Sequence, residues 1–150
     1  MNLQKTLSIG SDHGGFALKE ELKKRLAQSG FACEDEGCFS ADSVDYPDIA
    51  KLVCSDVARG KCGFGILICT SGIGMSMAAN KACGIRAALC LSEDAAKFSR
   101  MHNDANVLCL GAKYLDADLA ERIALLFAET GFDGGRHERR VKKIMSIQNG

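Results

Sequence analysis

Runs of apolar residues with two different periods alternate along this chain and predict an α/β fold. Short runs with little or no charge are typical of buried parallel strands. Longer segments with apolar residues at i, i+4 and i+8, such as Leu18, Leu22 and Leu26, are typical of helices that cover a sheet. The expected strands lie at residues 6–10, 31–36, 64–69, 86–91 and 106–110. The second strand is the most polar and is expected near an edge.

Five strands that alternate with helices favour a parallel sheet with helices on both faces, joined by right-handed crossovers. We therefore predict a three-layer sandwich with strand order 2-1-3-4-5, as in Rossmann-like and flavodoxin-like domains, and an extra C-terminal helix at about residues 136–147. Neither an internal repeat nor a low-complexity linker is present, so one domain covering residues 1–150 is expected.

The strongest candidate site follows the apolar run at 64–69, which ends in Cys69. The turn after it consists of Thr70, Ser71, Gly72, Ile73 and Gly74. A strand, a glycine-bearing turn and a helix N-terminus in succession can bind anionic oxygen through unpaired N–H groups. Cys69 beside that helix could act as a base or nucleophile near neutral pH, although a buried cysteine is more often a small core residue.

Asp12 and His13 follow the first expected strand. In a sheet of this topology, ligands bind where the carboxyl ends of the first and third strands meet. Asp12 and His13 are therefore expected beside Cys69 as substrate-binding residues. The alternative is that Asp12 only caps the next helix and His13 is only a solvated loop residue.

Two further clusters could carry chemistry. His102 and Asn103 lie between a helix and the last strand, where an imidazole could shuttle a proton, unless the pair only shapes the turn. Arg136 and Arg140 share one face of the last helix. They form either a fork able to hold a phosphate or part of a solvated basic helix.

Composition narrows the range of partners. A formal net charge of 0 offers no general attraction for nucleic acid or an anionic membrane, so any anion binding must be local. Eight cysteines without a C-x-x-C pair, and an N-terminal sequence without an apolar signal segment, favour a reducing cytoplasm over a disulfide framework. No run is long enough to span a membrane, and the three histidines show no metal-ligand spacing, so no metal is expected.

Motifs spread along the whole chain resemble ribose-5-phosphate isomerase type B, a family that also includes galactose-6-phosphate and allose-6-phosphate isomerases. They are S-D-H-G-G-F at 11–16, D-Y-P at 45–47, G-I-L-I-C-x-S-G-x-G at 65–74, A-N-K at 79–81, G-I-R-A at 84–87, H-N-D-x-N-V-L at 102–108 and G-G-R-H at 134–137. The resemblance runs nearly end to end. It implies interconversion of an aldose phosphate and its ketose phosphate without metal or other cofactor.

The resemblance also implies a role for each candidate. Cys69 corresponds to the base that takes the C2 proton and returns it at C1, while N–H groups of residues 70–74 hold the enediolate. Ser71 corresponds to a hydroxyl that moves protons between the two substrate oxygens, and His102 to the acid/base that opens the furanose ring. The implied substrate-binding residues are Asp12, His13, Thr70, Gly72, Ile73, Gly74, Asn103, Lys113, Arg136 and Arg140.

Members of the family are dimers or tetramers whose sites draw residues from two subunits, so His102 or the arginines could act in a partner's site. Two positions depart from the family pattern. Thr70 stands where glycine is common, which predicts strain if φ there is positive. Lys113 replaces a phosphate-binding arginine, so a point charge stands in place of a fork.

Other functions remain open to different degrees. By the same resemblance, Cys69 and Met75 place this chain with the family members that use a cysteine base rather than a glutamate. The galactose-6-phosphate branch generally lacks the H-N-D cluster that is intact here, so ribose 5-phosphate is expected rather than a six-carbon substrate, namely allose or galactose 6-phosphate. A cysteine phosphatase would need Cys-x5-Arg, but Met75 stands six residues after Cys69. The alternative from another class is a non-enzymatic, flavodoxin-like phosphate or nucleotide binding module. Its phosphate turn would follow the first strand, where Asp12 would repel phosphate.

Overall fold

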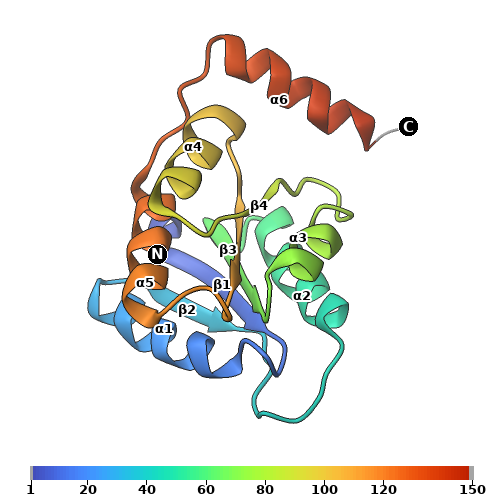
Figure 1. Ribbon diagram of the computed structural model, residues 1–150. Helices are drawn as coiled ribbons and strands as arrows, with labels where there is room; N and C mark the ends of the chain where they lie inside the picture. Colours follow the sequence, from blue (N-terminus) through green and yellow to red (C-terminus); the bar gives the residue numbers. More distant parts are fainter. Residues whose placement is uncertain (1, 149–150) are drawn as a thin grey trace.

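A computed structural model describes residues 2–148 of the chain, and the predicted boundaries at residues 1 and 150 lie outside this range. The strands are β1 (Thr6–Ser11), β2 (Ala32–Asp35), β3 (Phe64–Cys69), β4 (Ala87–Leu89) and β5 (Val107–Gly111). The helices are the short 3-10 helix η1 (Leu3–Lys5), then α1 (Phe16–Gln28), α2 (Tyr46–Ala58), α3 (Ile73–Ala79), α4 (Glu93–Asn103), α5 (Ala117–Glu129) and α6 (Arg136–Ile147). They surround one parallel sheet (Figure 1), which confirms the predicted fold class.

The strand order is β2-β1-β3-β5-β4, so the last two strands are exchanged relative to the predicted order. β5 pairs with β3, and its five residues are all buried. β4 has only three residues, all half-buried, and lies at the edge. The longer, fully apolar strand therefore occupies the interior of the sheet, where both of its faces are covered. The expected edge position of β2 is confirmed.

Helices cover both faces of the sheet, and successive strand residues contribute to opposite faces. On one face, Leu22 of α1 and Phe127 of α5 pack in a cluster with Ile66 and Ile68 of β3. On the other face, α2 and α3 pack against Leu67 and Cys69. The side chain of Cys69 is thus directed to the α2 and α3 side.

α6 is the extra C-terminal helix, and its bounds agree with the prediction. It lies against α4 at one end of the molecule, at the top of Figure 1. Val141 is its one buried residue, whereas Ile144 and Ile147 are exposed. No helix within residues 2–148 has the length and apolar character needed to cross a membrane.

Candidate active site

A crevice of about 430 Å³ lies at the carboxyl ends of β1 and β3. Its lining consists of Asp12, Tyr46, Cys69, Thr70, Ser71, Ile73, Gly74 and Met77. The structure therefore brings the end of β1 and the turn after β3 together, although 56 residues separate Asp12 from Cys69 in the sequence. This is the position at which doubly wound sheets bind ligands.

Cys69 ends β3, and only 5% of its surface is exposed. Its Sγ accepts a hydrogen bond from the backbone N–H of Gly72 at 3.1 Å. A hydrogen bond to sulfur stabilises the negatively charged thiolate. At two other cysteines, Cys54 and Cys90, burial disfavours the thiolate and raises the pKa to about 11.

The turn after Cys69 is shaped by one left-handed residue. Gly72 has a φ of 77° and immediately precedes α3. Among residues 2–148, Asp104 is the only non-glycine residue with positive φ. Thr70 therefore does not carry the backbone strain that its replacement of glycine predicted. Room for its side chain comes from Gly14, where a Cβ atom would lie 2.1 Å from Thr70 Oγ1.

Hydrogen bonds hold the rest of the turn. Ser71 Oγ accepts from the Ile73 N–H at 3.2 Å. The Lys113 N–H donates to the Thr70 carbonyl at 2.9 Å, so the segment after β5 is attached to the turn. Lys113 is exposed and lies at the same edge of the sheet as Cys69.

Asp12 lies where either of the two roles considered for it is possible. Its Oδ1 accepts from the Gly15 N–H at 3.1 Å and so supports the turn into α1, yet the residue also lines the crevice. His13 is exposed and does not line the crevice. Its Nδ1 accepts from the Val44 N–H at 3.3 Å, which connects it to the long segment before α2.

Tyr46 lines the crevice but was not among the predicted site residues. It is the first residue of α2, and its ring lies against Gly74. A Cβ atom at Gly74 would lie 2.6 Å from Tyr46 Cζ. The sequence signal was the D-Y-P motif, which marks the start of α2 but does not show that α2 packs beside α3.

A second group of predicted site residues lies toward the amino-terminal ends of the strands, away from the crevice. It consists of His102, Asn103, Arg136 and Arg140. His102 and Asn103 end α4, four residues before Val107 begins β5. Val107 pairs with Gly65, and Cys69 lies four residues further along β3, roughly 13 Å away at 3.3 Å per residue. Figure 1 shows α6 and the end of α4 at the top, and the carboxyl ends of the strands below. A single chain therefore does not bring His102 to Cys69.

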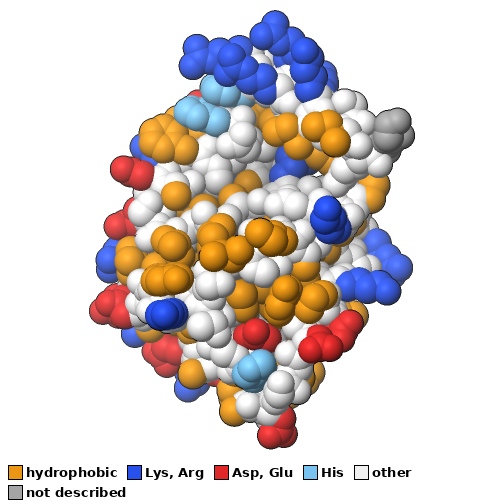
Figure 2. Space-filling view, turned by 45° about the vertical axis from the view of Figure 1, so that its right-hand side comes forward, with side chains coloured by type: hydrophobic (Ala, Val, Ile, Leu, Met, Phe, Trp, Pro, Cys, Tyr) orange, Lys and Arg blue, Asp and Glu red, His pale blue; other side chains and the backbone are white. Residues whose placement is uncertain are grey.

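The His102 ring stacks on the His137 ring, with ring centroids 4.3 Å apart and planes inclined by 9°. Loss of hydration lowers the pKa of His137, and the charges of His102, Arg136 and Arg140 act in the same direction, while Asp133 opposes them. Figure 2 shows histidine side chains directly beneath the Lys and Arg side chains of the α6 end.

One group of side chains has the residue types and the proximity that a metal site needs. The ligand atoms of His102, Asp133 and His137 lie within 4.8 Å of one another. Two nearly parallel imidazole planes, however, direct their nitrogen lone pairs side by side. A metal ion needs both lone pairs to converge on one point. We therefore assign no metal to this group.

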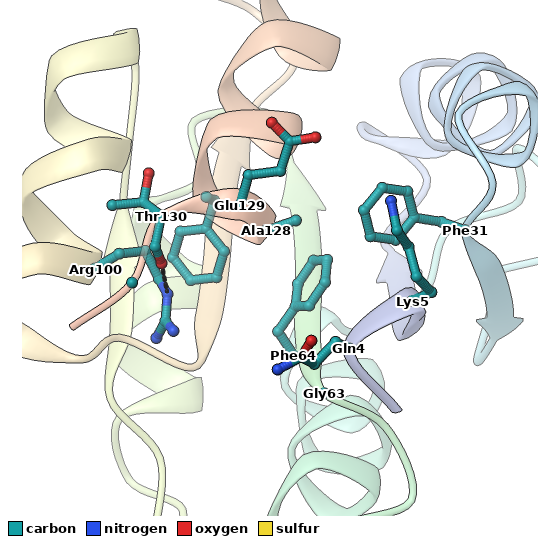
Figure 3. Close-up of a pocket in the computed structure, with 11 residues that line it drawn as sticks. Gln4, Lys5, Phe31, Gly63, Phe64, Arg100, Ala128, Glu129 and Thr130 are labelled. Atoms are coloured by element: carbon teal, nitrogen blue, oxygen red, sulfur yellow. Dashed lines mark hydrogen bonds between the residues drawn. The ribbon is translucent and has the colours of Figure 1, made fainter. Parts of the chain in front are cut away.

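A separate hollow of about 380 Å³ lies at the amino edge of the sheet (Figure 3). Phe31 and Phe64 line it, and Arg100 Nε donates to the Thr130 carbonyl beside it at 3.3 Å. None of the predicted site residues lines this hollow. It therefore plays no part in the candidate active site.

A flavodoxin-like sheet with a cysteine and a serine in the crevice at its switch point defines an α/β protein suited to a small anionic substrate. The chain belongs to the Ribose/Galactose Isomerase family, whose model matches residues 7–144. The resemblance found in the sequence is thereby confirmed.

Similar proteins match over nearly the whole chain. Ribose-5-phosphate isomerase B of Escherichia coli is 42% identical, covering 96% of this chain and 97% of the relative. A ribose-5-phosphate isomerase B structure from Clostridium thermocellum has a TM-score of 0.94 at 46% identity, with 96% of this chain and 97% of that chain covered. One from Thermotoga maritima has a TM-score of 0.92 at 50% identity, with coverages of 94% and 97%.

Proposed function

We propose that this chain is an aldose–ketose isomerase that interconverts ribose 5-phosphate and ribulose 5-phosphate without a cofactor. The observation that carries the proposal is the Cys69 sulfur at the crevice, with a backbone N–H directed at it. Support comes from relatives that are named ribose-5-phosphate isomerase B and match almost the full length of the chain. Residues 1–150 then form one catalytic domain.

The proposed chemistry begins with Cys69. Its thiolate removes the proton from C2 of the open-chain aldose, and the electron pair left behind forms the enediolate. The same sulfur then returns the proton to C1, which gives the ketose. The Ser71 hydroxyl transfers a proton from one substrate oxygen to the other, so the proton count balances.

The enediolate oxygen needs hydrogen-bond donors. Gly72 N–H already donates to Cys69, and Ile73 N–H to Ser71 Oγ. Within residues 2–148, the N–H groups of Ser71 and Gly74 donate to no protein acceptor. These two groups are the proposed oxyanion donors. Asp12, Thr70 and Tyr46 line the remaining wall and would contact the sugar hydroxyls.

Ring opening requires a second copy of the chain in this proposal. His102 and Cys69 lie at opposite edges of the sheet, so His102 would act in the partner's crevice, with Asn103 beside it. Arg136 and Arg140 lie at the same end of the sheet as His102 and would hold the phosphate from that side. Lys113 would act in the crevice of its own chain, beside Cys69. The exposed apolar side chains of Ile73 and Met77 at the crevice support a subunit contact there. Figure 2 shows further apolar side chains gathered across this side of the molecule.

The non-enzymatic alternative is less well supported. A flavodoxin-like module would bind phosphate at the turn after β1. There the Asp12 carboxylate already accepts from Gly15 N–H, the kind of donor that a phosphate would need. Six-carbon aldose phosphates remain the alternative substrates.

We further propose a reducing, cytoplasmic setting. Residues 2–148 contain all eight cysteines, and each is a free thiol. A zero net charge likewise supports a small-molecule substrate rather than nucleic acid or a membrane surface as partner.

The test is turnover of ribose 5-phosphate by the purified protein in a chelator, with Cys69→Ala and the exposed-cysteine control Cys83→Ala. We expect turnover in the parent and in Cys83→Ala, and a loss of about 10²–10⁴-fold in Cys69→Ala. Turnover retained by Cys69→Ala would exclude Cys69 as the base. If the parent is inactive on ribose, allose and galactose phosphates, the binding-module alternative is favoured instead.

A further inference from the structure

Two aromatic neighbours confine the His102 ring. His137 of α6 stacks on it at a centroid distance of 4.3 Å, with planes inclined by 9°. Phe98, one turn earlier in α4, contacts it at 5.1 Å and 39°. His102 and His137 are both half-buried. The ring of His102 is therefore packed by one neighbour from its own helix and one from α6.

No hydrogen bond orients this ring. Within residues 2–148, neither nitrogen of His102 has a hydrogen-bond partner, and the same is true of His137. A general acid or base must aim one nitrogen at the proton that it transfers. Catalytic histidines are usually aimed by a hydrogen bond from a third group. Here only packing is available for that purpose.

The backbone places His137 accurately enough for the stack. Gly134 and Gly135 have φ values of 68° and 56°, and they turn the chain into α6. The Asp133 N–H donates to the Met101 carbonyl at 3.0 Å, so the turn is attached to α4 beside His102. The His137 N–H donates to the Gly134 carbonyl at 3.1 Å.

We propose that His137 is a positioning residue that holds the His102 ring in the orientation needed for ring opening, by stacking and not by contact with substrate. This inference rests on the proposed function. His137 lies between Arg136 and Arg140 in α6, so one helix carries both the expected phosphate clamp and the support for the ring-opening histidine. Seating the phosphate on α6 then also fixes His102.

The test is a double-mutant cycle with His102→Ala and His137→Ala, with His137→Phe as the conservative variant. His137→Ala should lower kcat about 10-fold with little change in KM, because a misaimed acid/base acts less often. His137→Phe preserves a flat ring and should restore kcat to within about threefold. In the His102→Ala background, His137→Ala should cause no further loss, since it acts only through His102.

Independent, multiplicative losses in the double mutant would overturn the proposal. So would a rise in KM that persists without His102, because it would assign His137 to the phosphate clamp. A second readout needs no activity: the ring-proton NMR signal of His102 should move in His137→Ala and largely return in His137→Phe. An unmoved signal means that there is no stack in solution. An inactive parent protein would count against the proposed isomerase function, while the NMR comparison would still test the stack.

Discussion

The backbone N–H of Gly72 lies 3.1 Å from the sulfur of Cys69, and the left-handed conformation of the same glycine turns the chain from this contact directly into α3. With φ at 77°, the chain turns at Gly72, and α3 begins at the next residue. A side chain at residue 72 would disfavour that conformation. The path of the chain from the proposed base into α3 therefore depends on a residue that itself contributes no side chain.

Gly72→Ala is expected to impair both stability and turnover. A Cβ atom there would lie 2.5 Å from Leu89 Cδ1 and 2.9 Å from the Leu110 carbonyl carbon, in addition to the cost of positive φ. The matched control is Gly84→Ala, which has a similar φ of 79° but open space around its Cβ. Denaturant unfolding should show a loss of about 1–2 kcal/mol for Gly84→Ala and a larger loss for Gly72→Ala. Equal losses would mean that the crowding around residue 72 relaxes freely.

Tyr46 offers a second test of the crevice. Its ring lies against Gly74 and forms one wall, so Tyr46→Ala should enlarge the crevice, raise KM for the sugar phosphate and lower kcat, by about 10-fold in kcat/KM. Tyr46→Phe retains the wall and separates packing from a contribution of the hydroxyl. Steady-state kinetics of the two variants provide the comparison. Unchanged kinetics in Tyr46→Ala would place the substrate elsewhere.

Much of this fold could be predicted because its signals are local. The charge-free run ending in Cys69 and the helix starting after Gly134 and Gly135 were both placed with the bounds that the structure shows. The order of β4 and β5 could not be predicted in this way. Which strand pairs with β3 depends on the burial of whole strands in the folded sheet. The sequence pattern of residues 86–91 also predicts a longer strand than the three-residue β4 of the structure.

The candidate site was likewise predictable only where its residues lie at the ends of neighbouring strands. Asp12 and Cys69 were expected in one crevice because topology alone places the ends of neighbouring strands together. Tyr46 was missed because its position depends on the packing of α2 against α3, which local sequence does not encode. The stack of His137 on His102 depends likewise on how α6 seats on α4.

Stability should depend on pH through the pair formed by the buried Lys19 and the half-buried Asp35. Lys19 is fully buried, and its Nζ donates to Asp35 at 2.6 Å. Burial alone would raise the pKa of Asp35, but hydrogen bonds from Lys19, Lys23 and the Gly37 N–H outweigh it and hold the pKa below its usual value. A lowered folded-state pKa stabilises the fold above the unfolded-state pKa, near 3.9, and this stabilisation is lost as the pH falls through the folded-state pKa.

The measurement is the free energy of unfolding between pH 7 and pH 2, for the parent and for Asp35→Asn. The variant should lose up to about 3–5 kcal/mol at pH 7, because it leaves the buried Lys19 with only Glu20, at 3.2 Å, as an ionised partner. It should also show a weaker decline toward acid. As a control, Glu138→Gln removes an exposed pair with Lys142 and should cost less than about 1 kcal/mol. Parallel pH curves for the parent and Asp35→Asn would show that other carboxylates cause the loss of stability at low pH.

Mixing two inactive variants tests whether the site is shared between subunits. His102 and Cys69 lie at opposite edges of one chain, so the proposed site takes Cys69 from one copy and His102 from another. Cys69→Ala and His102→Ala should each lose about 10²-fold or more of the activity on their own.

In a mixed dimer, one site carries both substitutions and the other carries neither. Random mixing by co-refolding should therefore restore about a quarter of the parent activity, since about half of the dimers are mixed and each has one intact site. If both residues instead acted within one chain, every site would carry one substitution and mixing would restore nothing. Mixing Cys69→Ala with the double variant Cys69→Ala/His102→Ala supplies no intact cysteine and should stay inactive in either case.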